Sequence, residues 1–281
     1  MPFLAIPYPI IDPVLLQIGP VAIRWYALAY VFGIVFGWLY ARRIVTNDAL
    51  WGPKGSPITK RRIDDFVVFA TLGVVVGGRL GYVLIYDFST FIDEPLKIFA
   101  LWEGGMSFHG GFIGVIVALV LFARYAKLPM WSLIDVAAVA TPIGLFLGRI
   151  TNFINGELYG RVSDVPWAMV FPDGGPDPRH PSQLYEAGLE GIALGLILWY
   201  FAYRKRRLRT PRFLSGAFVA FYGAARIFVE FFRQPDVQIG EDGFLAGDVT
   251  MGMVLSIPML IIGLLVMFFA ARQTPGEAKA S

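Results

Sequence analysis

The sequence predicts an all-α polytopic membrane protein with about seven transmembrane helices, and three observations lead to that class. Hydrophobic residues occupy 56% of the 281 positions, whereas charged residues occupy only 16%. The mean hydropathy is +0.61, and a soluble domain cannot bury that much apolar side chain. Apolar stretches long enough to cross a bilayer recur along the chain, joined by short linkers. We therefore expect residues 1–281 to form a single transmembrane helical domain with an outer loop region around 152–182.

Each expected helix satisfies the requirement of about 20 mostly apolar residues. The expected spans are 21–41, 65–86, 107–124, 132–151, 184–203, 213–232 and 247–271. The short segment 88–103 mixes apolar and acidic residues, and we expect it to lie flat at a membrane surface. Glycines four residues apart, as in Gly73/Gly77 and Gly144/Gly148, indicate close packing between helices.

Lysine and arginine predict the orientation of these helices, because basic loops stay in the cytoplasm. Of the 24 basic residues, sixteen fall in one set of alternate loops, four in the other set, and four within or beside the spans. This asymmetry places the N-terminus in the periplasm and the C-terminus in the cytoplasm. The basic run 204–212 is then a contact for lipid headgroups, and we expect no nucleic acid partner.

The composition also limits the possible chemistry. The chain has no cysteine, which excludes disulfides, thiolate metal sites and a cysteine nucleophile of its own. It has only two histidines, His109 and His180, and its carboxylates are not clustered in sequence. We therefore expect neither a metal nor a cofactor.

In this orientation, the charged residues of the spans gather toward the periplasmic side. Arg149 lies near the outer end of its span, and Arg226 precedes Glu230 by one helical turn. A charge at such a depth is costly and is usually retained for a substrate, an ion or a partner. Because a guanidinium can bind a phosphate through two parallel hydrogen bonds, several arginines at one depth predict a site for a lipid phosphate.

A purely structural alternative remains open for each of these arginines. Arg226 could pair with Glu230, and Arg149 with Glu157, only to hold helices together. Arg24 and Arg79 fit a structural role as well as a functional one.

His109 is the histidine within an expected span, and it is followed by Gly110 and Gly111. An imidazole can take up a proton near neutral pH, so His109 is a candidate general base. A hydrogen-bonding role in packing is the alternative. The glycines would let either a bulky substrate or another backbone approach.

The outer loop 156–182 contains Gly, Pro and Asp residues typical of turns. Pro181 followed by Ser182 and Gln183 predicts a helix start, with Glu186 near its first turn. The loop can be interpreted as a capped helix start or as a flexible arm over the site.

Four motifs, in this order on seven spans, resemble the prolipoprotein diacylglyceryl transferases of bacterial inner membranes. They are 104–111 (GGMSFHGG), 148–161 (GRITNFINGELYGR), 179–186 (RHPSQLYE) and 222–235 (YGAARIFVEFFRQP). The resemblance runs through nearly the whole chain. It implies an enzyme that transfers the diacylglyceryl group of phosphatidylglycerol to the lipobox cysteine in the signal peptide of a preprolipoprotein. A thioether forms and glycerol phosphate is released, as the first step of lipoprotein maturation.

The resemblance also implies roles for individual residues. The implied catalytic residues are His109, Arg149 and Arg226. The implied substrate-binding residues are Tyr26, Asn152, Glu157, Gly160, Tyr222 and Glu230. From the residues alone, two other classes stay open: a transporter for an anionic substrate and a lipid-binding scaffold. The absence of an evident internal repeat, and the position of the charges toward one side, favour the enzyme over the transporter.

Overall fold

A computed structural model describes residues 6–19, 21–100, 104–235, 244–246 and 249–272 of the chain. The chain divides into two compact units, Met1–Tyr40 with Asp135–Ser281, and Ala41–Ile134. In the described residues, six helices are long and apolar enough to cross a membrane, and a seventh apolar helix is shorter. The predicted class, a mostly helical polytopic membrane protein, is thereby confirmed. The orientation of the termini and the single-domain assignment stay predictions.

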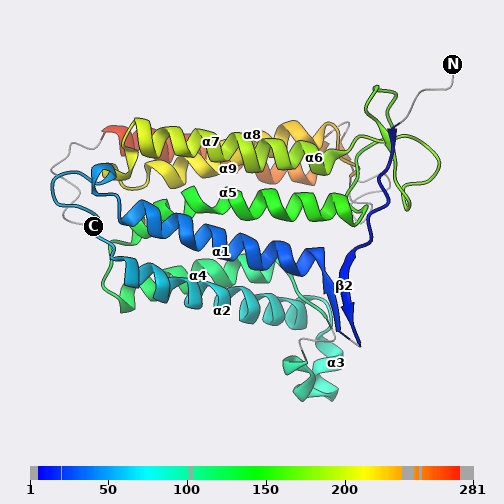
Figure 1. Cartoon of the computed structure of the whole chain (residues 1–281), viewed down its shortest axis with the longest axis horizontal. Helices are drawn as coiled ribbons and strands as arrows, with labels where there is room; N and C mark the ends of the chain where they lie inside the picture. Colours follow the sequence, from blue (N-terminus) through cyan, green and yellow to red (C-terminus); the bar gives the residue numbers. More distant parts are fainter. Residues whose placement is uncertain (1–5, 20, 101–103, 236–243, 247–248, 273–281) are drawn as a thin grey trace. The chain divides into compact units, whose positions relative to one another are not determined.

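The helices follow the seven expected spans closely (Figure 1). They are α1 (Trp25–Val45), α2 (Lys60–Ile85), α4 (Phe108–Tyr125), α5 (Met130–Ile154), a continuous helix from Ser182 to Arg204, α8 (Phe213–Glu230) and α9 (Met251–Arg272). The continuous helix consists of α6 (Ser182–Glu186), the π-helical η4 (Ala187–Ala193), α7 (Leu194–Trp199) and the π-helical η5 (Tyr200–Arg204).

Three two-stranded sheets were not expected from the sequence. The strand β1 (Ile6–Pro7) runs parallel to β4 (Met169–Val170). The antiparallel pairs are β2 (Val14–Ile18) with β3 (Val21–Arg24), and β5 (Phe244–Ala246) with β6 (Val249–Thr250). The first and last spans therefore begin later than predicted, because β3 and β6 occupy their first residues.

The remaining elements are short. They are η1 (Asp48–Leu50), α3 (Phe88–Asp93), η2 (Pro95–Phe99) and η6 (Arg207–Arg209). Within the segment 88–103, α3 and η2 expose large apolar side chains such as Ile92 and Leu96, while 101–103 lie outside the described residues. Its placement at a membrane surface stays a prediction.

In the unit Ala41–Ile134, glycines bring α2 and α4 into backbone contact. A Cβ atom on Gly77 would lie 2.7 Å from the Cα of Gly114, and one on Gly81 would lie 2.7 Å from the Cα of Gly110. These positions tolerate no side chain without a shift of backbone atoms. The predicted role of the glycine pairs on α2 is confirmed, and Gly110 accommodates a neighbouring backbone.

The same unit satisfies Arg79, a charged residue inside α2, with main-chain oxygens. The buried guanidinium donates hydrogen bonds to the carbonyls of Lys97, Ile98 and Gly104, at 2.5, 2.9 and 2.5 Å. Arg79 thus fixes the chain that leads into α4, which is the structural role that the sequence allowed for it.

In the other unit, Asp135 on α5 anchors the start of α8. Its buried carboxylate accepts hydrogen bonds from the backbone N–H groups of Arg212 (2.9 Å) and Ser215 (2.7 Å). The first N–H groups of a helix have no partner within the helix, so a carboxylate from another helix can satisfy them. This contact sets where α8, which carries Arg226, begins.

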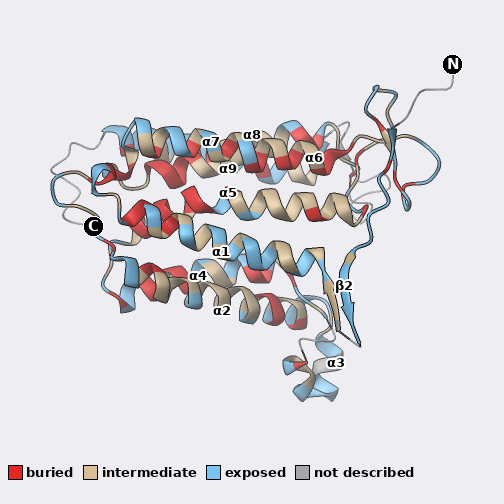
Figure 2. Ribbon diagram, viewed as in Figure 1, coloured by how far each residue is buried: buried red, intermediate tan, exposed pale blue. Residues whose placement is uncertain are grey.

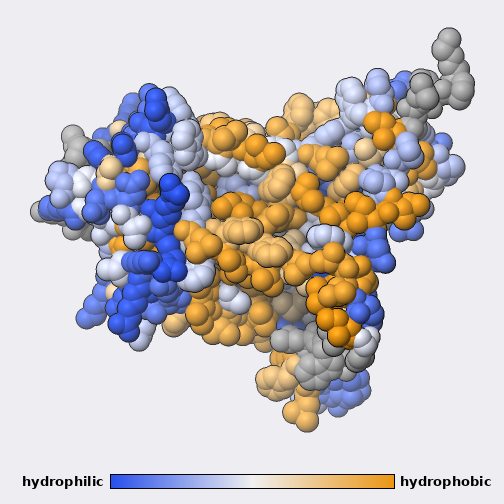
Figure 3. Space-filling model, viewed as in Figure 1, coloured by the Kyte–Doolittle hydropathy of each residue, from blue (hydrophilic) through white to orange (hydrophobic). Residues whose placement is uncertain are grey.

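Many outward-facing side chains of the long helices are large and apolar. Leu72 and Leu84 on α2, and Ile262 and Phe269 on α9, are exposed. Exposed positions recur along the long helices (Figure 2). Hydrophobic residues cover the middle of the helices, and hydrophilic residues gather at their ends (Figure 3). Such surfaces match lipid chains rather than water.

The α2–α4 contact gives a first testable prediction. Gly77→Ala should destabilise the protein by about 1–3 kcal/mol, because its methyl group meets backbone atoms that cannot rotate away. Thermal unfolding in detergent would measure the loss. Gly111→Ala on α4 is the control: its methyl group would meet its nearest neighbour at an ordinary 3.5 Å, so its melting temperature should not fall. Equal melting temperatures for Gly77→Ala and wild type would contradict the packing.

Candidate functional site

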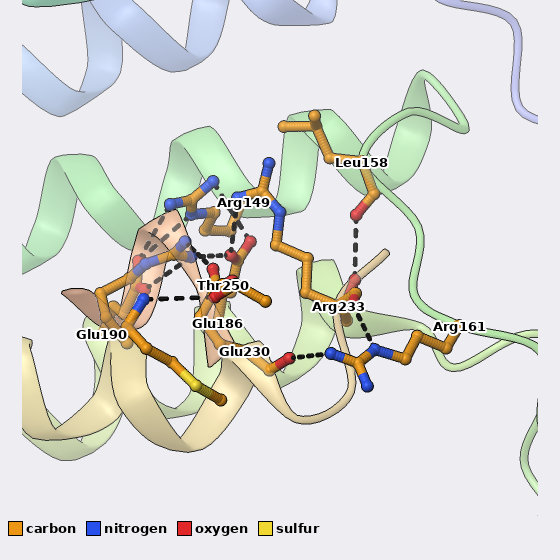
Figure 4. A network of polar contacts seen from close by, with 11 residues as sticks. Arg149, Leu158, Arg161, Glu186, Glu190, Glu230, Arg233 and Thr250 are labelled. Carbon is orange, nitrogen blue, oxygen red and sulfur yellow. Dashed lines mark hydrogen bonds and ion pairs between the residues drawn. The ribbon is translucent and has the colours of Figure 1, made fainter. Parts of the chain in front are cut away.

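Three arginines and three glutamates form one ion-pair cluster in the unit that contains α5, α6 and α8. We call this set, Arg149, Arg226, Arg233, Glu186, Glu190 and Glu230, the arginine–glutamate cluster (Figure 4). Its charges balance, with three guanidinium groups facing three carboxylates. The sequence prediction that Arg149 and Arg226 converge is therefore confirmed.

Two glutamates each bridge the same two arginines. Glu186 contacts Arg149 through Oε2 at 3.2 Å and Arg226 through Oε1. Glu190 contacts Arg149 through Oε2 at 3.1 Å and Arg226 through Oε1 at 3.6 Å. Since both carboxylates span the pair, the two guanidinium groups are held side by side.

The remaining pairs extend the cluster along α8. Arg226 also contacts Glu230, which follows it by one turn. Arg233 reaches Glu186 Oε1 at 3.7 Å from just beyond the end of α8. The structural alternative considered for Arg226, pairing with Glu230, is thus present, but as one of three ion pairs that Arg226 makes.

The charges of the cluster differ in depth. The carboxylate side chains are 1%, 0% and 5% exposed for Glu186, Glu190 and Glu230. The side chains of Arg149, Arg226 and Arg233 are 18%, 11% and 15% exposed. The arginine side chains therefore keep some accessible surface, whereas the carboxylate side chains keep almost none. A guanidinium has five N–H donors, so ion pairing on one side leaves donors for a ligand on the other.

A close approach of two helices brings Glu190 to Arg149. Gly191 follows Glu190 in η4, and a Cβ atom there would lie 2.8 Å from the Cα of Phe146 on α5. Arg149 lies one turn further along α5 from Phe146. Because Gly191 has no side chain, η4 comes near enough for Glu190 to bind Arg149. The π-helical form of η4 is of a kind often found at functional sites.

Glu230 also links α8 to the start of α9. Its Oε2 accepts a hydrogen bond from the Thr250 hydroxyl at 2.7 Å, and the Thr250 oxygen accepts one from the Met253 N–H at 3.2 Å. A Cβ atom on Gly252 would overlap the Glu230 carboxylate. The carboxylate thus lies against the N-terminus of a helix, where negative charge is favoured.

Glu157 does not pair with Arg149 in the described structure, unlike the structural alternative considered from sequence. Its exposed carboxylate accepts hydrogen bonds from the side chains of Asn152 (2.8 Å) and Asn155 (3.2 Å). Its backbone carbonyl accepts one from Gln183 at 2.6 Å. The reason is geometric: the chain turns at Gly156, where φ is +70°, so Glu157 folds back onto the end of α5 while Glu186 and Glu190 approach Arg149.

Gly160 is buried in the packing of the outer loop. A Cβ atom on it would lie 2.7 Å from the Cβ of His180 and would overlap the carbonyl oxygen of Phe232. Arg161 then ties the loop to the end of α8 by donating to the carbonyls of Arg233 (2.9 Å) and Glu230 (3.0 Å). Burial lowers the pKa of His180 below its ordinary value, which favours the neutral imidazole. The loop is thus hydrogen-bonded to α8, and α6 starts at Ser182 as predicted.

The two tyrosines expected in the site lie beside the cluster. Tyr222 on α8 precedes Arg226 by one turn and lies within electrostatic range of Glu190 and Arg149. Tyr26, at the start of α1, interacts with Arg149 and Glu157, and its hydroxyl lies 3.1 Å from that of Tyr30.

His109 belongs to the other compact unit, Ala41–Ile134. It is exposed in the first turn of α4, after Ser107, whose hydroxyl oxygen caps the helix by accepting from the Gly110 N–H at 3.2 Å. Its role as a base stays a prediction.

Four members of this site were not predicted from the sequence: Glu186, which was placed only near a helix start, and Glu190, Arg233 and Thr250. Glu190 carried a usable signal, because it is an acidic residue inside an expected span and lies one turn after Glu186. Arg233 lies within the motif 222–235, next to Phe231 and Phe232, but just beyond the charged turn of the span; Thr250 is uncharged and carried no such signal.

The family model described as prolipoprotein diacylglyceryl transferase matches residues 13–269. Among curated relatives, a protein of Rhizobium meliloti (strain 1021) is 56% identical over 92% of this chain and 92% of its own length. One of Rhodopseudomonas palustris is 57% identical over 100% and 97%, respectively. One of Brucella canis is 53% identical over 99% and 98%. All three carry the name phosphatidylglycerol–prolipoprotein diacylglyceryl transferase.

The burial of the cluster yields a stability prediction. Glu190→Ala should cost about 3–5 kcal/mol, because it removes a buried carboxylate that pairs with both Arg149 and Arg226. The exposed ion pair between Glu94 and Lys97 provides the control: Glu94→Ala should cost only about 0–1 kcal/mol. Thermal unfolding of both variants in one detergent would compare them. Similar losses in the two variants would show that the cluster contributes no more than a surface pair.

Proposed function

We propose the activity of this chain from one premise: the chain belongs to the prolipoprotein diacylglyceryl transferase family. It transfers the diacylglyceryl group of phosphatidylglycerol to the thiol of a lipobox cysteine in a preprolipoprotein signal peptide. The observation that supports this most is the bridged pair of Arg149 and Arg226. Two guanidinium groups held side by side, each with an accessible edge, suit a phosphodiester of single negative charge.

The reaction needs charge stabilisation at the phosphate and a deprotonated sulfur. The sulfur forms a bond to the glyceryl carbon that bore the phosphate, and the carbon–oxygen bond breaks. Its electron pair stays on the phosphate oxygen, so negative charge grows there and glycerol phosphate leaves. Arg149 and Arg226 stabilise that growing charge. The thiol proton leaves to a base, because the thiolate is the reactive form.

The other residues act around this centre. His109 serves as the base that receives the thiol proton. Tyr26, Tyr222 and Asn152 complete the polar shell around the headgroup. Glu230 orients Arg226, Glu157 orients Asn152, and Gly160 keeps the outer loop packed. Phosphatidylglycerol enters laterally from the bilayer, since an aqueous route for two acyl chains would be costly.

The first experiment is a reconstituted assay with phosphatidylglycerol and a lipobox peptide in cysteine and serine forms. Mass spectrometry should detect a diacylglyceryl adduct only on the cysteine peptide. Arg149→Ala and Arg226→Ala should each reduce the rate on the order of 10²-fold or more, because each removes a donor to the growing charge. Arg62→Ala, which removes an exposed guanidinium that pairs with Asp65 at 3.8 Å, is the control and should keep its activity.

The outcomes of this assay separate the candidate functions. If folded wild-type protein formed no adduct, the transferase proposal would be overturned. The arginines would then be interpreted as part of a transporter or a lipid-binding scaffold. Full activity in His109→Gln would remove that residue as the required base and leave the arginine field to activate the thiol.

We further propose that the chain lies in the bacterial inner membrane with its site toward the periplasmic leaflet. The natural absence of cysteine makes this testable by single-cysteine labelling. In spheroplasts, Asp164→Cys in the outer loop should react with a membrane-impermeant maleimide. Lys54→Cys, also exposed, should react only after permeabilisation, and the parent chain should not react. The reverse labelling pattern would refute the orientation.

A further inference from the structure

Among the described residues, the six side chains that define the arginine–glutamate cluster comprise as many carboxylates as guanidinium groups, although the proposed ligand is an anion. Three guanidinium groups are matched by the carboxylates of Glu186, Glu190 and Glu230. A site selected only for tight binding of a phosphate would leave its arginines uncompensated, because each added carboxylate repels the ligand. The matched charges therefore require an explanation beyond phosphate binding.

Glu190 is the member of the cluster best suited to test how a carboxylate charge beneath the arginines changes ligand binding. Its side chain is 0% exposed, so it cannot touch a substrate in this arrangement. Its Oε2 accepts hydrogen bonds from Arg149 Nε (3.2 Å) and Nη2 (3.1 Å), and its Oε1 lies 3.6 Å from Arg226 Nη1. Glu190 thus acts on a ligand only through the two arginines, as a positioning residue.

The proposed reaction makes this charge balance important at product release. Phosphatidylglycerol brings a phosphodiester of charge −1, whereas the product is a phosphate monoester. Near neutral pH such a monoester carries about −1.5 to −2, because its second pKa is about 6. An uncompensated arginine pair would bind the product more tightly than the headgroup of the substrate and would retain it.

We infer that Glu190, together with Glu186, sets the charge beneath Arg149 and Arg226 so that glycerol phosphate is released after each transfer. This inference rests on the proposed function. It concerns the turnover of the site rather than the chemical step. The carboxylates fix the direction of both guanidinium groups and at the same time weaken their hold on a second negative charge.

The test compares wild type with Glu190→Gln, which removes the charge but keeps the size and an acceptor oxygen. Glycerol phosphate should inhibit Glu190→Gln at concentrations about tenfold or more below those needed for wild type. The steady-state rate should fall while the first turnover, followed by rapid quench, keeps its rate. Glu190→Asp, which retains the charge, should bind glycerol phosphate as weakly as wild type. Glu94→Gln, at an exposed pair, should change neither quantity.

Several results would overturn the inference. One is equal inhibition of wild type and folded Glu190→Gln by glycerol phosphate; another is a loss of the first turnover as large as that of the steady state. If Glu190→Gln does not fold, Glu186→Gln removes the same charge one turn earlier and should show the same shift. A measurement on the wild-type protein also tests the inference: if wild type bound glycerol phosphate more tightly than phosphatidylglycerol, the inference would be contradicted. Calorimetry measures the affinity for glycerol phosphate without turnover. Failure of the proposed function would instead appear as the absence of adduct in the wild-type assay, so the two failures can be distinguished.

Discussion

The neutralisation of Arg149 and Arg226 is the constraint on which the surrounding structure depends. A guanidinium inside a membrane-spanning helix must find its partners within the protein, since lipid chains offer none. Here two of the partners, Glu186 and Glu190, come from another helix, so that helix must approach both α5 and α8 closely enough for side chains to meet. Gly191 makes this possible, because it allows η4 to reach Phe146 of α5 one turn before Arg149. In this unit the ion pairs therefore depend on the close packing of the helices, and a larger side chain at Gly191 would disturb both.

The same principle extends from the cluster to its periphery. The Glu230 carboxylate accepts a hydrogen bond from the Thr250 hydroxyl. The carboxylate that pairs with Arg226 therefore also fixes the start of α9. At the opposite end of α8, the carboxylate of Asp135 holds the first N–H groups. Both ends of the helix that carries Arg226 are thus attached to neighbouring helices through acidic side chains. A guanidinium must be placed accurately to stabilise a growing charge, and anchors at both ends supply that accuracy.

The sequence predicted the membrane spans and the two central arginines because hydropathy and the cost of buried charge are local properties. It suggested Glu230 for Arg226, which is one of the partners of that arginine, but it did not predict Glu186 or Glu190 as partners. Proximity along the chain suggested Glu157 for Arg149, but the turn at Gly156 directs Glu157 to Asn152, and the partners come from 37 and 41 positions away. The short strands were missed for a similar reason, since their pairing depends on segments as distant as Ile6 and Met169. Partner choice is a tertiary property, which periodicity and composition do not contain.

Burial also limits which groups can receive the proton of a substrate thiol. A base must touch the thiol, and the side chains of Glu186 and Glu190 are only 1% and 0% exposed. Their contribution is therefore indirect: they hold the guanidinium groups whose field favours the thiolate. The proton itself therefore has to go to an exposed group. If the arginine field lowers the pKa of the thiol far enough, the need for any base at that position falls. Depth thus decides how a charged group can act on the substrate thiol. A buried charge can lower the pKa of the thiol through its electric field, whereas only a group at the surface of the site can accept the proton.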